Sequence, residues 1–283
     1  MFAMMNDLIQ AAFQHRYAVL AINCFNLETA RAAIQAAEQQ RAPLILNVYQ
    51  GHCAHFPPTV AVPLVQALAS SATVPVALAL DHGKAFSLLG QAFRAGLTGL
   101  MIDASADPLA DNIRQTAAVV KMAHTAGVCV EGELGHIADA PTYELADASV
   151  KMTQVQDVLP FIEQTNIDLL AISVGTAHGL YPPGVKPKID FQRLQELHAV
   201  STRPLALHGG SGTPAEDIRR VSEYGVAKIN LGAAVFDAGK RAVQQALLQH
   251  PHAELADLLG LMESACREVV AEYLGWSGSA NRI

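Results

Sequence analysis

Eight short apolar runs without polar alternation recur along the chain. They are rich in Val, Ile and Leu and lie at Tyr17–Ile22, Leu44–Val48, Val76–Leu80, Gly99–Ile102, Val128–Val130, Leu169–Val174, Pro204–Leu207 and Val226–Ile229. Such runs are typical of strands that are buried on both faces, as in parallel sheets. Longer segments with helical periodicity separate them, including Leu27–Gln40, Pro108–Ala126, Val155–Gln164 and Pro214–Tyr224. The pattern therefore predicts eight strands that alternate with helices.

This alternation predicts an α/β fold, namely a (β/α)8 TIM barrel with a C-terminal helical extension. The main alternative is a doubly wound open sheet, which normally carries a nucleotide-binding loop after its first strand. No GxGxxG motif follows Tyr17–Ile22, and this favours the barrel. No Pro/Gly/Ser-rich linker and no block of charge divides residues 1–283, so we expect a single domain.

The composition fits a large buried core and argues against several classes of protein. The chain is 51% hydrophobic and 16% charged, which argues against disorder. Its net charge of -7, without a basic stripe, argues against a nucleic-acid partner. No apolar run has the length of a membrane span, and the first residues, which include Asp7, predict a helix rather than a signal peptide. The four cysteines lack CxxC spacing, so we expect reduced thiols and a cytoplasmic location.

Chemically reactive side chains follow the apolar runs. In chain order they are Asn23 and Asn26, Gly51 and His52, Asp81 and His82, Asp103, Glu131 and Glu133, Thr176 and His178, His208, and Asn230. Polar residues resume after any buried strand, but this alone does not favour His, Asp and Glu so often. In a barrel the carboxyl ends of all strands meet on one face, where active sites are built. We therefore expect these side chains to converge.

Three of the 11 histidines stand out, because each follows a predicted strand. They are His82, His178 and His208, and the last two lie in the glycine-bearing turns GTAHG and LHGGSG. Any one of them alone would be read as a packed residue. Together, three neutral imidazoles from separate strands predict an open zinc site, with one coordination position left for substrate. An all-imidazole shell leaves the full charge on the metal, which suits the polarisation of a carbonyl group.

A glycine-rich segment, HGGSG at 208–212, precedes Thr213-Pro214 and a predicted helix. Glycines let backbone N–H groups approach a phosphate, and a helix N-terminus adds its positive end. A phosphate site after the seventh and eighth strands recurs in barrels of this kind. A tight turn with a helix cap is the alternative interpretation.

These residues resemble the class II (zinc-dependent) fructose/tagatose-bisphosphate aldolases over nearly the whole chain. The blocks YAVLAINCFNLE, LALDHG, GLMIDAS, VEGELG, VGTAHGLYPPG, LALHGGSG and AKIN follow the family's order and approximate spacing. The resemblance implies reversible cleavage of a ketose phosphate or bisphosphate to dihydroxyacetone phosphate and an aldehyde, through a zinc-stabilised enediolate. It also implies a monovalent cation (Na⁺ or K⁺) near the phosphate, and a homodimer or homotetramer.

The resemblance assigns a role to each matching residue. His82, His178 and His208 would bind Zn²⁺, with Asp103 and Glu133 beside it, where a displaced metal can also be held. Asp81 would exchange a proton with the hydroxyl that becomes the aldehyde. The substrate and its phosphate would be bound by Asn26, Gly179, Gly209, Gly210, Ser211, Asn230, Gly232 and Ala233.

The sequence departs from the family pattern at three places. After the ELG motif the family has an acidic cluster that supplies a second acid or base, but Ala140-Pro141 stands here. Glu144 is our choice for that role, with Tyr143 and Asp139 as alternatives. Leu231-Gly232-Ala233-Ala234 lacks the usual Thr, and Tyr49 replaces a small Ser. These departures bear on the bisphosphate substrate more than on the reaction class.

Two other functions are consistent with parts of the pattern, and a third is disfavoured. A Schiff-base aldolase could use Lys228, which shares strand parity with Asn230, although Lys228 could equally pair with Glu131. A non-catalytic, aldolase-like partner subunit would explain the missing loop acid. A zinc hydrolase would carry an HxH pair in its first strand, and Ala21-Ile22-Asn23 offers none.

Overall fold

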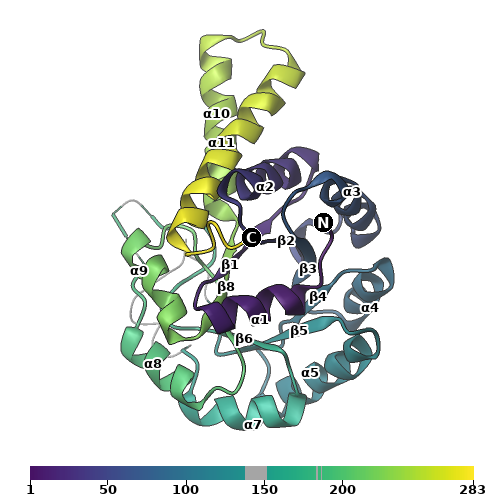
Figure 1. Ribbon diagram of the computed structural model, residues 1–283, viewed down its shortest axis with the longest axis vertical. Helices are drawn as coiled ribbons and strands as arrows, with labels where there is room; N and C mark the ends of the chain where they lie inside the picture. Colours follow the sequence, from purple (N-terminus) through teal and green to yellow (C-terminus); the bar gives the residue numbers. More distant parts are fainter. Residues whose placement is uncertain (138–151, 183, 186) are drawn as a thin grey trace.

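The computed structural model describes residues 1–137, 152–182, 184–185 and 187–283. Eight parallel strands close into a barrel in chain order (Figure 1). They are β1 Val19–Asn23, β2 Leu44–Tyr49, β3 Val76–Gly83, β4 Gly99–Ile102, β5 Cys129–Leu134, β6 Leu169–Ile172, β7 Leu205–Leu207 and β8 Val226–Leu231. The last strand pairs with the first, with Ala21 beside Asn230. The predicted TIM barrel is confirmed, and the open sheet is excluded.

The helices surround the barrel, close its amino-terminal end or extend beyond it. They are α1 Met5–His15, α2 Leu27–Gln40, α3 Pro58–Ser71, α4 Phe86–Ala95, α5 Leu109–Ala123, α7 Val155–Thr165, α8 Phe191–Val200, α9 Ala215–Arg220, α10 Ala233–Gln249 and α11 Leu255–Trp276. The predicted helix at 108–126 ends in a 3₁₀ turn, His124–Ala126, and the one at 214–224 shortens to α9 followed by the 3₁₀ turn Val221–Tyr224. Among the described residues, no helix is long and apolar enough to span a membrane.

Helix α1 closes the amino-terminal end of the barrel (Figure 1). Its buried face carries Met5, Leu8, Ile9 and Ala12 and packs against β1, β3 and β8. Since this end is covered, only the carboxyl end of the strands can open into a cavity. The predicted first helix is therefore present. Because it covers the amino-terminal end, the cavity opens at the carboxyl end of the barrel.

The barrel interior is filled mostly by small side chains. One hydrophobic cluster lies between the strands and the outer helices, and a second fills the barrel and the space under α1. The second cluster contains many alanines, among them Ala21, Ala77, Ala79, Ala171 and Ala206. Small side chains leave room for longer polar ones, and Lys228 is among the largest fully buried residues.

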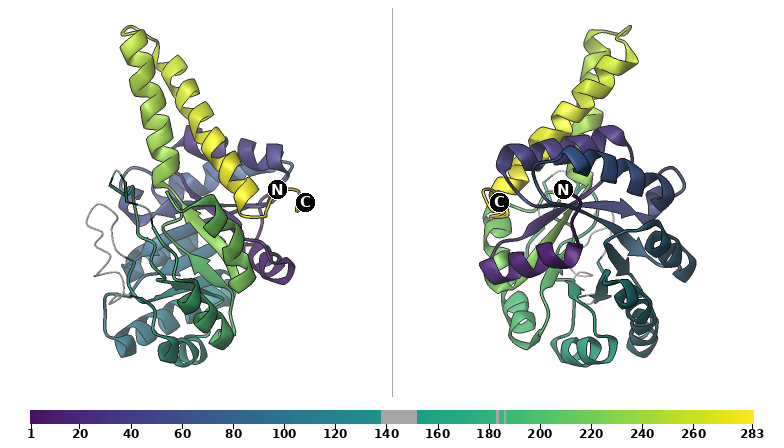
Figure 2. Two further views of the ribbon diagram at one scale, coloured as in Figure 1. Left: turned by 90° about the vertical axis from the view of Figure 1, so that its left-hand side faces the viewer. Right: turned by 45° about the vertical axis from the view of Figure 1, so that its right-hand side comes forward.

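Helices α10 and α11 form a hairpin that projects beyond the barrel (Figures 1 and 2). The base of the hairpin packs on α2, where Arg31 pairs with the buried Glu263. Its far end exposes large apolar side chains, namely Leu247, Leu248, Leu255 and Leu261. This hairpin is the predicted C-terminal helical extension.

Candidate active site

A cavity of about 580 Å³ opens at the carboxyl end of the strands. Side chains from β1, β2, β3, β5 and β8 and from the segments after β4, β6 and β7 line it. Twelve of the residues chosen from the sequence are among them: Asp81, His82, Asp103, Glu133, His178, Gly179, His208, Gly209, Ser211, Asn230, Gly232 and Ala233. The barrel therefore brings together groups that are far apart in the sequence.

Asp81 and His82 are adjacent, and yet both line the cavity. In a regular strand their side chains would point to opposite faces. Here His82 takes a left-handed backbone conformation with φ 54°, and the register between β3 and β4 shifts between Leu80 and Gly83. Such a conformation costs a non-glycine residue on the order of 1–3 kcal/mol, and strain of this kind clusters at functional sites. The irregularity lets one strand deliver two reactive groups to one cavity.

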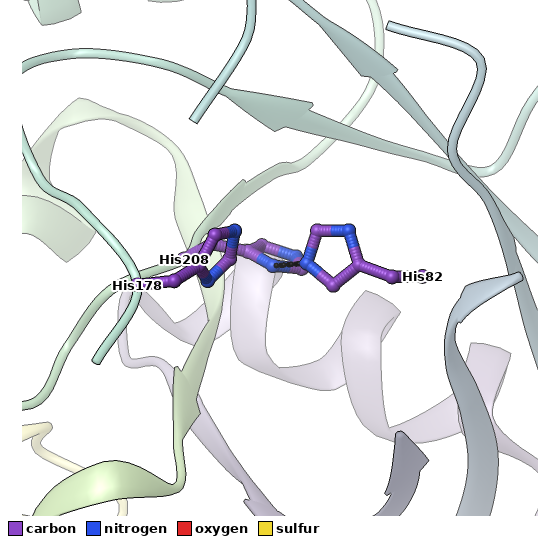
Figure 3. Close-up of side chains that lie close together, drawn as sticks. All are labelled: His82, His178 and His208. Carbon is purple, nitrogen blue, oxygen red and sulfur yellow. Dashed lines mark hydrogen bonds between the residues drawn. The ribbon is translucent and has the colours of Figure 1, made fainter. Parts of the chain in front are cut away.

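The three imidazoles converge (Figure 3). The ring centroid of His82 lies 4.6 Å from that of His178 and 4.8 Å from that of His208, and each pair is nearly perpendicular. One ring nitrogen from each residue lies within 4.8 Å of the others. The closest approach, 3.0 Å, is between Nε2 of His82 and Nδ1 of His208.

Two of these histidines each contact a carboxylate with the opposite ring nitrogen. Nδ1 of His82 lies 3.0 Å from Oδ2 of Asp103, and Nε2 of His208 lies 2.7 Å from Oε1 of Glu131. Burial would raise the pKa of both acids. At Asp103 the hydrogen bond to His82, the charge of His82 and the hydrogen bonds from Ser105 together outweigh burial and hold the pKa well below its usual range. At Glu131 the charge of Lys228 and the bond to His208 lower the pKa to about 2. Both acids are therefore anions that accept hydrogen bonds.

The converging nitrogens fit a metal ion. Because His82 and His208 donate to carboxylates, the facing nitrogens of the neutral rings carry lone pairs. Two lone pairs 3.0 Å apart repel each other unless a proton or a cation lies between them. Three imidazole donors with a free side suit a zinc ion, and their second nitrogens have the carboxylate partners that metal-binding histidines usually have.

The pKa values of the three histidines differ because their neighbours differ. Burial lowers the pKa of His82, but Asp81 and the hydrogen bond to Asp103 outweigh burial and raise it to about 9. Burial and the charges of the other two imidazoles lower the pKa of His178 to about 3. Burial also lowers the pKa of His208, in spite of its carboxylate partner. Without metal, the proton between Nε2 of His82 and Nδ1 of His208 is therefore bound to His82 at neutral pH.

A second group of ligand atoms adjoins the first. His82, Asp103 and Glu133 also offer atoms within 4.8 Å of one another. Burial and the charge of Asp103 raise the pKa of Glu133 to about 8. Among the described residues, Oε2 of Glu133 has no hydrogen-bond partner. This geometry fits the expectation that Asp103 and Glu133 lie beside the metal.

Asp81 is held between two amides. Nδ2 of Asn23 donates to Oδ2 of Asp81 at 3.1 Å, and Nδ2 of Asn230 donates to Oδ1 at 2.9 Å. Burial raises the pKa of Asp81, but the charges of His82 and His208 outweigh it and lower the pKa. Within the described part of the chain, Oδ1 of each asparagine lacks a hydrogen-bond partner and could accept a substrate hydroxyl.

The glycine-rich cradle lies beside the N-terminus of α10. Gly209 has φ 69°, and a Cβ there would come within 2.4 Å of Ala177 O, so only glycine fits. Ser211 accepts the N–H of Ala234 at 3.0 Å. The sequence pointed to the helix after Thr213-Pro214, but that helix, α9, has six residues, and the first residue of α10 lines the cavity instead. Backbone donors and a helix N-terminus there suit a phosphate.

Three residues named in the sequence analysis are described by the structure and do not line the cavity, namely Asn26, Gly210 and Lys228. Asn26 caps α2, where its Oδ1 accepts from Thr29 N. Gly210 donates its N–H to Asn230 O at 3.1 Å. Glu144 lies outside the described residues, as do Tyr143 and Asp139. Lys228 donates to Glu131 at 2.6 Å and does not line the cavity, which leaves no support for a Schiff base.

Sequence reasoning did not choose Lys84 or His136. It named Asn23 and Glu131 among the strand-end residues expected to converge, but gave neither of them a role in binding substrate or metal. Asn26 was the asparagine chosen to bind substrate, but it is Asn23, at the end of β1, that reaches Asp81. Lys84 and His136 line the cavity rim, and only their proximity to DHG and ELG could have indicated this. Glu131 shares strand parity with Glu133, a signal that the sequence did contain.

The chain is similar to class II aldolases in sequence and structure. The family model described as "Fructose-bisphosphate aldolase class-II" matches residues 3–282. A Bacillus subtilis (strain 168) protein named "Probable fructose-bisphosphate aldolase" is 35% identical over 284 residues, which cover 98% of each chain. The YdjI aldolase from Escherichia coli K12 superposes with a TM-score of 0.87 at 28% identity, covering 100% of this chain and 99% of that one. Fructose-bisphosphate aldolase from Campylobacter jejuni shares the fold, with a TM-score of 0.86 at 20% identity and coverage of 100% and 97%.

The family model spans almost all of this chain, and the Bacillus subtilis relative aligns over nearly its full length. Aldolase chemistry also accounts for the convergence of three histidines, Asp81 and an anion cradle in one cavity. The chain therefore belongs to the class II fructose-bisphosphate aldolase family, and the protein is an aldolase, a carbon–carbon lyase.

Proposed function

We propose that this aldolase is zinc-dependent and cleaves a ketose phosphate reversibly to dihydroxyacetone phosphate and an aldehyde. The observation that carries the proposal is the 3.0 Å approach of two ring nitrogens whose opposite nitrogens are bound to carboxylates. His82, His178 and His208 would hold the ion. When bound, it would supply a Lewis acid for the negative charge that cleavage leaves on the ketose oxygens.

The chain's own residues would orient substrate and move a proton. Asp81 is ionised and fixed by two amides, so it is suited to take the proton of the hydroxyl that becomes the aldehyde. The unpaired carbonyl oxygens of Asn23 and Asn230 would accept hydrogen bonds from the hydroxyls of the substrate. The buried position of Asp81 would keep bulk water from competing for that proton.

The phosphate of dihydroxyacetone phosphate would lie in the cradle of Gly179, Gly209, Ser211 and the first residue of α10. Backbone N–H groups at a helix N-terminus bind phosphate without a side-chain hydroxyl, so Ala233 is compatible with this role. The bulk of Tyr49 at the cavity wall leaves less space near the ketose than a serine would. We therefore propose that one phosphate binds in the cradle, and the proposal does not specify whether the other end of the substrate carries a second phosphate.

A panel of ketose phosphates and aldehydes against zinc-loaded protein tests this function. We expect condensation of dihydroxyacetone phosphate with at least one aldehyde, and loss of turnover after treatment with a chelator. Exchange of a C3 proton of dihydroxyacetone phosphate, followed by NMR, checks the first half-reaction. Zinc-loaded protein that gives neither exchange nor condensation would contradict the proposal.

A monovalent cation, Na⁺ or K⁺, is part of the proposed phosphate site. Gly179 and Gly209 both line this part of the cavity, and backbone carbonyl oxygens there could bind such an ion. Turnover measured in K⁺, Na⁺ and tetramethylammonium salts at equal ionic strength tests this. Equal rates in all three salts would contradict the proposed role of a monovalent cation.

We also propose a cytoplasmic homodimer or homotetramer that assembles through the α10–α11 hairpin. Leu248 is 85% exposed and Leu255 is 69% exposed at its far end, which is costly for an isolated hairpin in water. The double substitution Leu248→Glu and Leu255→Glu should reduce the mass measured by light scattering, whereas Val60→Glu on α3 should not. A monomeric wild-type protein would overturn the proposal.

A further inference from the structure

A buried ion pair lies inside the barrel, behind His208. Glu131 on β5 and Lys228 on β8 are each about 1% exposed. Nζ of Lys228 donates to Oε2 of Glu131 at 2.6 Å, and Nε2 of His208 donates to Oε1 at 2.7 Å. Neither Glu131 nor Lys228 lines the cavity, so neither can touch a substrate.

Stability alone does not account for this pair. Removing two charges from water is costly, and an apolar pair of similar volume is often at least as stable in a protein interior. The barrel interior that holds the pair also contains small apolar residues such as Ala21, Ala79 and Ala206, whose side chains cannot hydrogen-bond to either charge. The pair therefore calls for a role beyond holding the barrel together.

The contacts of His208 indicate what that role is. Its Nε2 is bound to Glu131, while its Nδ1 faces the cavity, 3.0 Å from Nε2 of His82 and 3.2 Å from Nδ2 of Asn230. An ionised carboxylate can only accept, so Nε2 must carry the hydrogen and Nδ1 must carry the lone pair. Lys228 occupies the second oxygen of Glu131 and so prevents the carboxylate from turning away.

We propose that Glu131 and Lys228 are positioning residues that fix the ring orientation and tautomer of His208, so that its Nδ1 lone pair faces the metal position. This inference rests on the proposed zinc site. Lys228 anchors the carboxylate, the carboxylate anchors the imidazole, and the imidazole presents one nitrogen to the cavity. Partners of this kind commonly change metal affinity by 10- to 100-fold when they are removed.

Zinc affinity is the first test, because it can be measured without turnover. Glu131→Gln, Lys228→Met and the double variant E131Q/K228M would be titrated with zinc against a chromophoric chelator at one pH. We expect a dissociation constant about 10- to 100-fold higher for each. The matched control is Asp168→Asn, because Asp168 contacts His124 at 2.9 Å in a similar pair on the outer surface of the barrel. This control should leave zinc affinity within about twofold of wild type.

A spectroscopic readout separates positioning from a structural role. In metal-free protein, ¹⁵N shifts of the His208 ring should report hydrogen on Nε2 in the wild type. In Glu131→Gln a mixture of tautomers is expected, because an amide can either accept or donate. A wild-type Nε2–H signal that persists unchanged in that variant would overturn the inference.

The double variant keeps the test decisive if a single variant fails to fold, because it replaces both charges with neutral groups of similar size. We expect it to keep the wild-type circular dichroism spectrum and to bind zinc weakly. Wild-type affinity in the double variant, or its failure to fold, would overturn the inference. Failure of the wild type itself to bind zinc would instead contradict the proposed function.

Discussion

The site contains two histidine–carboxylate pairs that have the same chemistry and different surroundings. The His82–Asp103 pair lies near the rim, with side chains 9% and 7% exposed, whereas the His208–Glu131 pair is 0% and 1% exposed. At the rim, Glu133 lies 3.7 Å from the same ring nitrogen of His82 and could replace Asp103. In the barrel interior, Glu131 has no such substitute among the described residues. The deep pair should therefore tolerate less change than the rim pair.

The largest effect is expected from His208→Ala. This substitution removes one of the three proposed zinc ligands and leaves the Glu131–Lys228 ion pair in place, so the barrel should still fold. We expect zinc to be absent from the purified protein, and turnover to fall roughly 10³-fold or more, as loss of several kcal/mol of metal catalysis implies. Metal content by mass spectrometry and circular dichroism check this. Full zinc occupancy would make the ligand assignment wrong.

Asp81→Asn should separate proton transfer from metal binding. Asp81 lies 4.0 Å from Nε2 of His82 and belongs to neither pair, so its removal should change zinc content little. Loss of a general base typically lowers turnover by about 10²- to 10⁴-fold. The measurement is kcat with zinc-saturated enzyme, alongside metal content. Normal turnover in this variant would remove Asp81 from the mechanism.

Asp103→Asn tests the tolerance of the rim pair. Because Glu133 can accept from Nδ1 of His82, we expect zinc affinity to fall by about tenfold at most, the low end for a lost carboxylate partner. The loss of zinc affinity in Glu131→Gln, measured by the same competition with a chelator, should be well above tenfold. A larger loss for Asp103→Asn than for Glu131→Gln would reverse the comparison. In that case solvent exposure would not predict sensitivity.

The convergence of the site was predictable from the sequence, because the topology alone enforces it. Once eight buried strands are expected to close, every residue at the carboxyl end of a strand is placed on one face. The strand-end residues that line the cavity for that reason are Asn23, Asp81, His82, Asp103, Glu133, His178, His208 and Asn230. The parity of Lys228 even suggested a partner in Glu131, and the two are bonded. These inferences needed only strand periodicity and the geometry of a barrel.

Local backbone detail was not predictable in the same way. The DHG motif does not predict the left-handed backbone conformation at His82, which lets two adjacent side chains both point into the cavity. Asn23 and Asn26 both follow β1 or end it, and only the start of α2 decides that Asn26 becomes a cap. Likewise, the sequence did not indicate that the N-terminus of α10, and not that of the short α9, lies at the cavity. It lies there because Gly232 and Ala233 directly follow the last strand.

The smallest effect, and the finest comparison of the two pairs, is the number of protons released when zinc binds. A ligand imidazole must be neutral, and the pKa of His82 is raised to about 9, so it carries a proton below pH 9. His178, whose pKa is lowered to about 3, and His208 are already neutral and release none. About one proton should therefore leave His82 near pH 7, and Glu133, whose pKa is raised to about 8, can add another.

This release should disappear as the pH rises above 9, because both groups are then already deprotonated. Calorimetric titrations with zinc, in two buffers of different ionisation enthalpy, give the number directly. In Asp103→Asn the profile should move to lower pH, since the negative charge of Asp103, which raises the pKa of both His82 and Glu133, is lost. In Asp168→Asn it should stay in place. If wild-type protein released no proton near pH 7, His82 would not carry a proton between the two converging rings in the metal-free site.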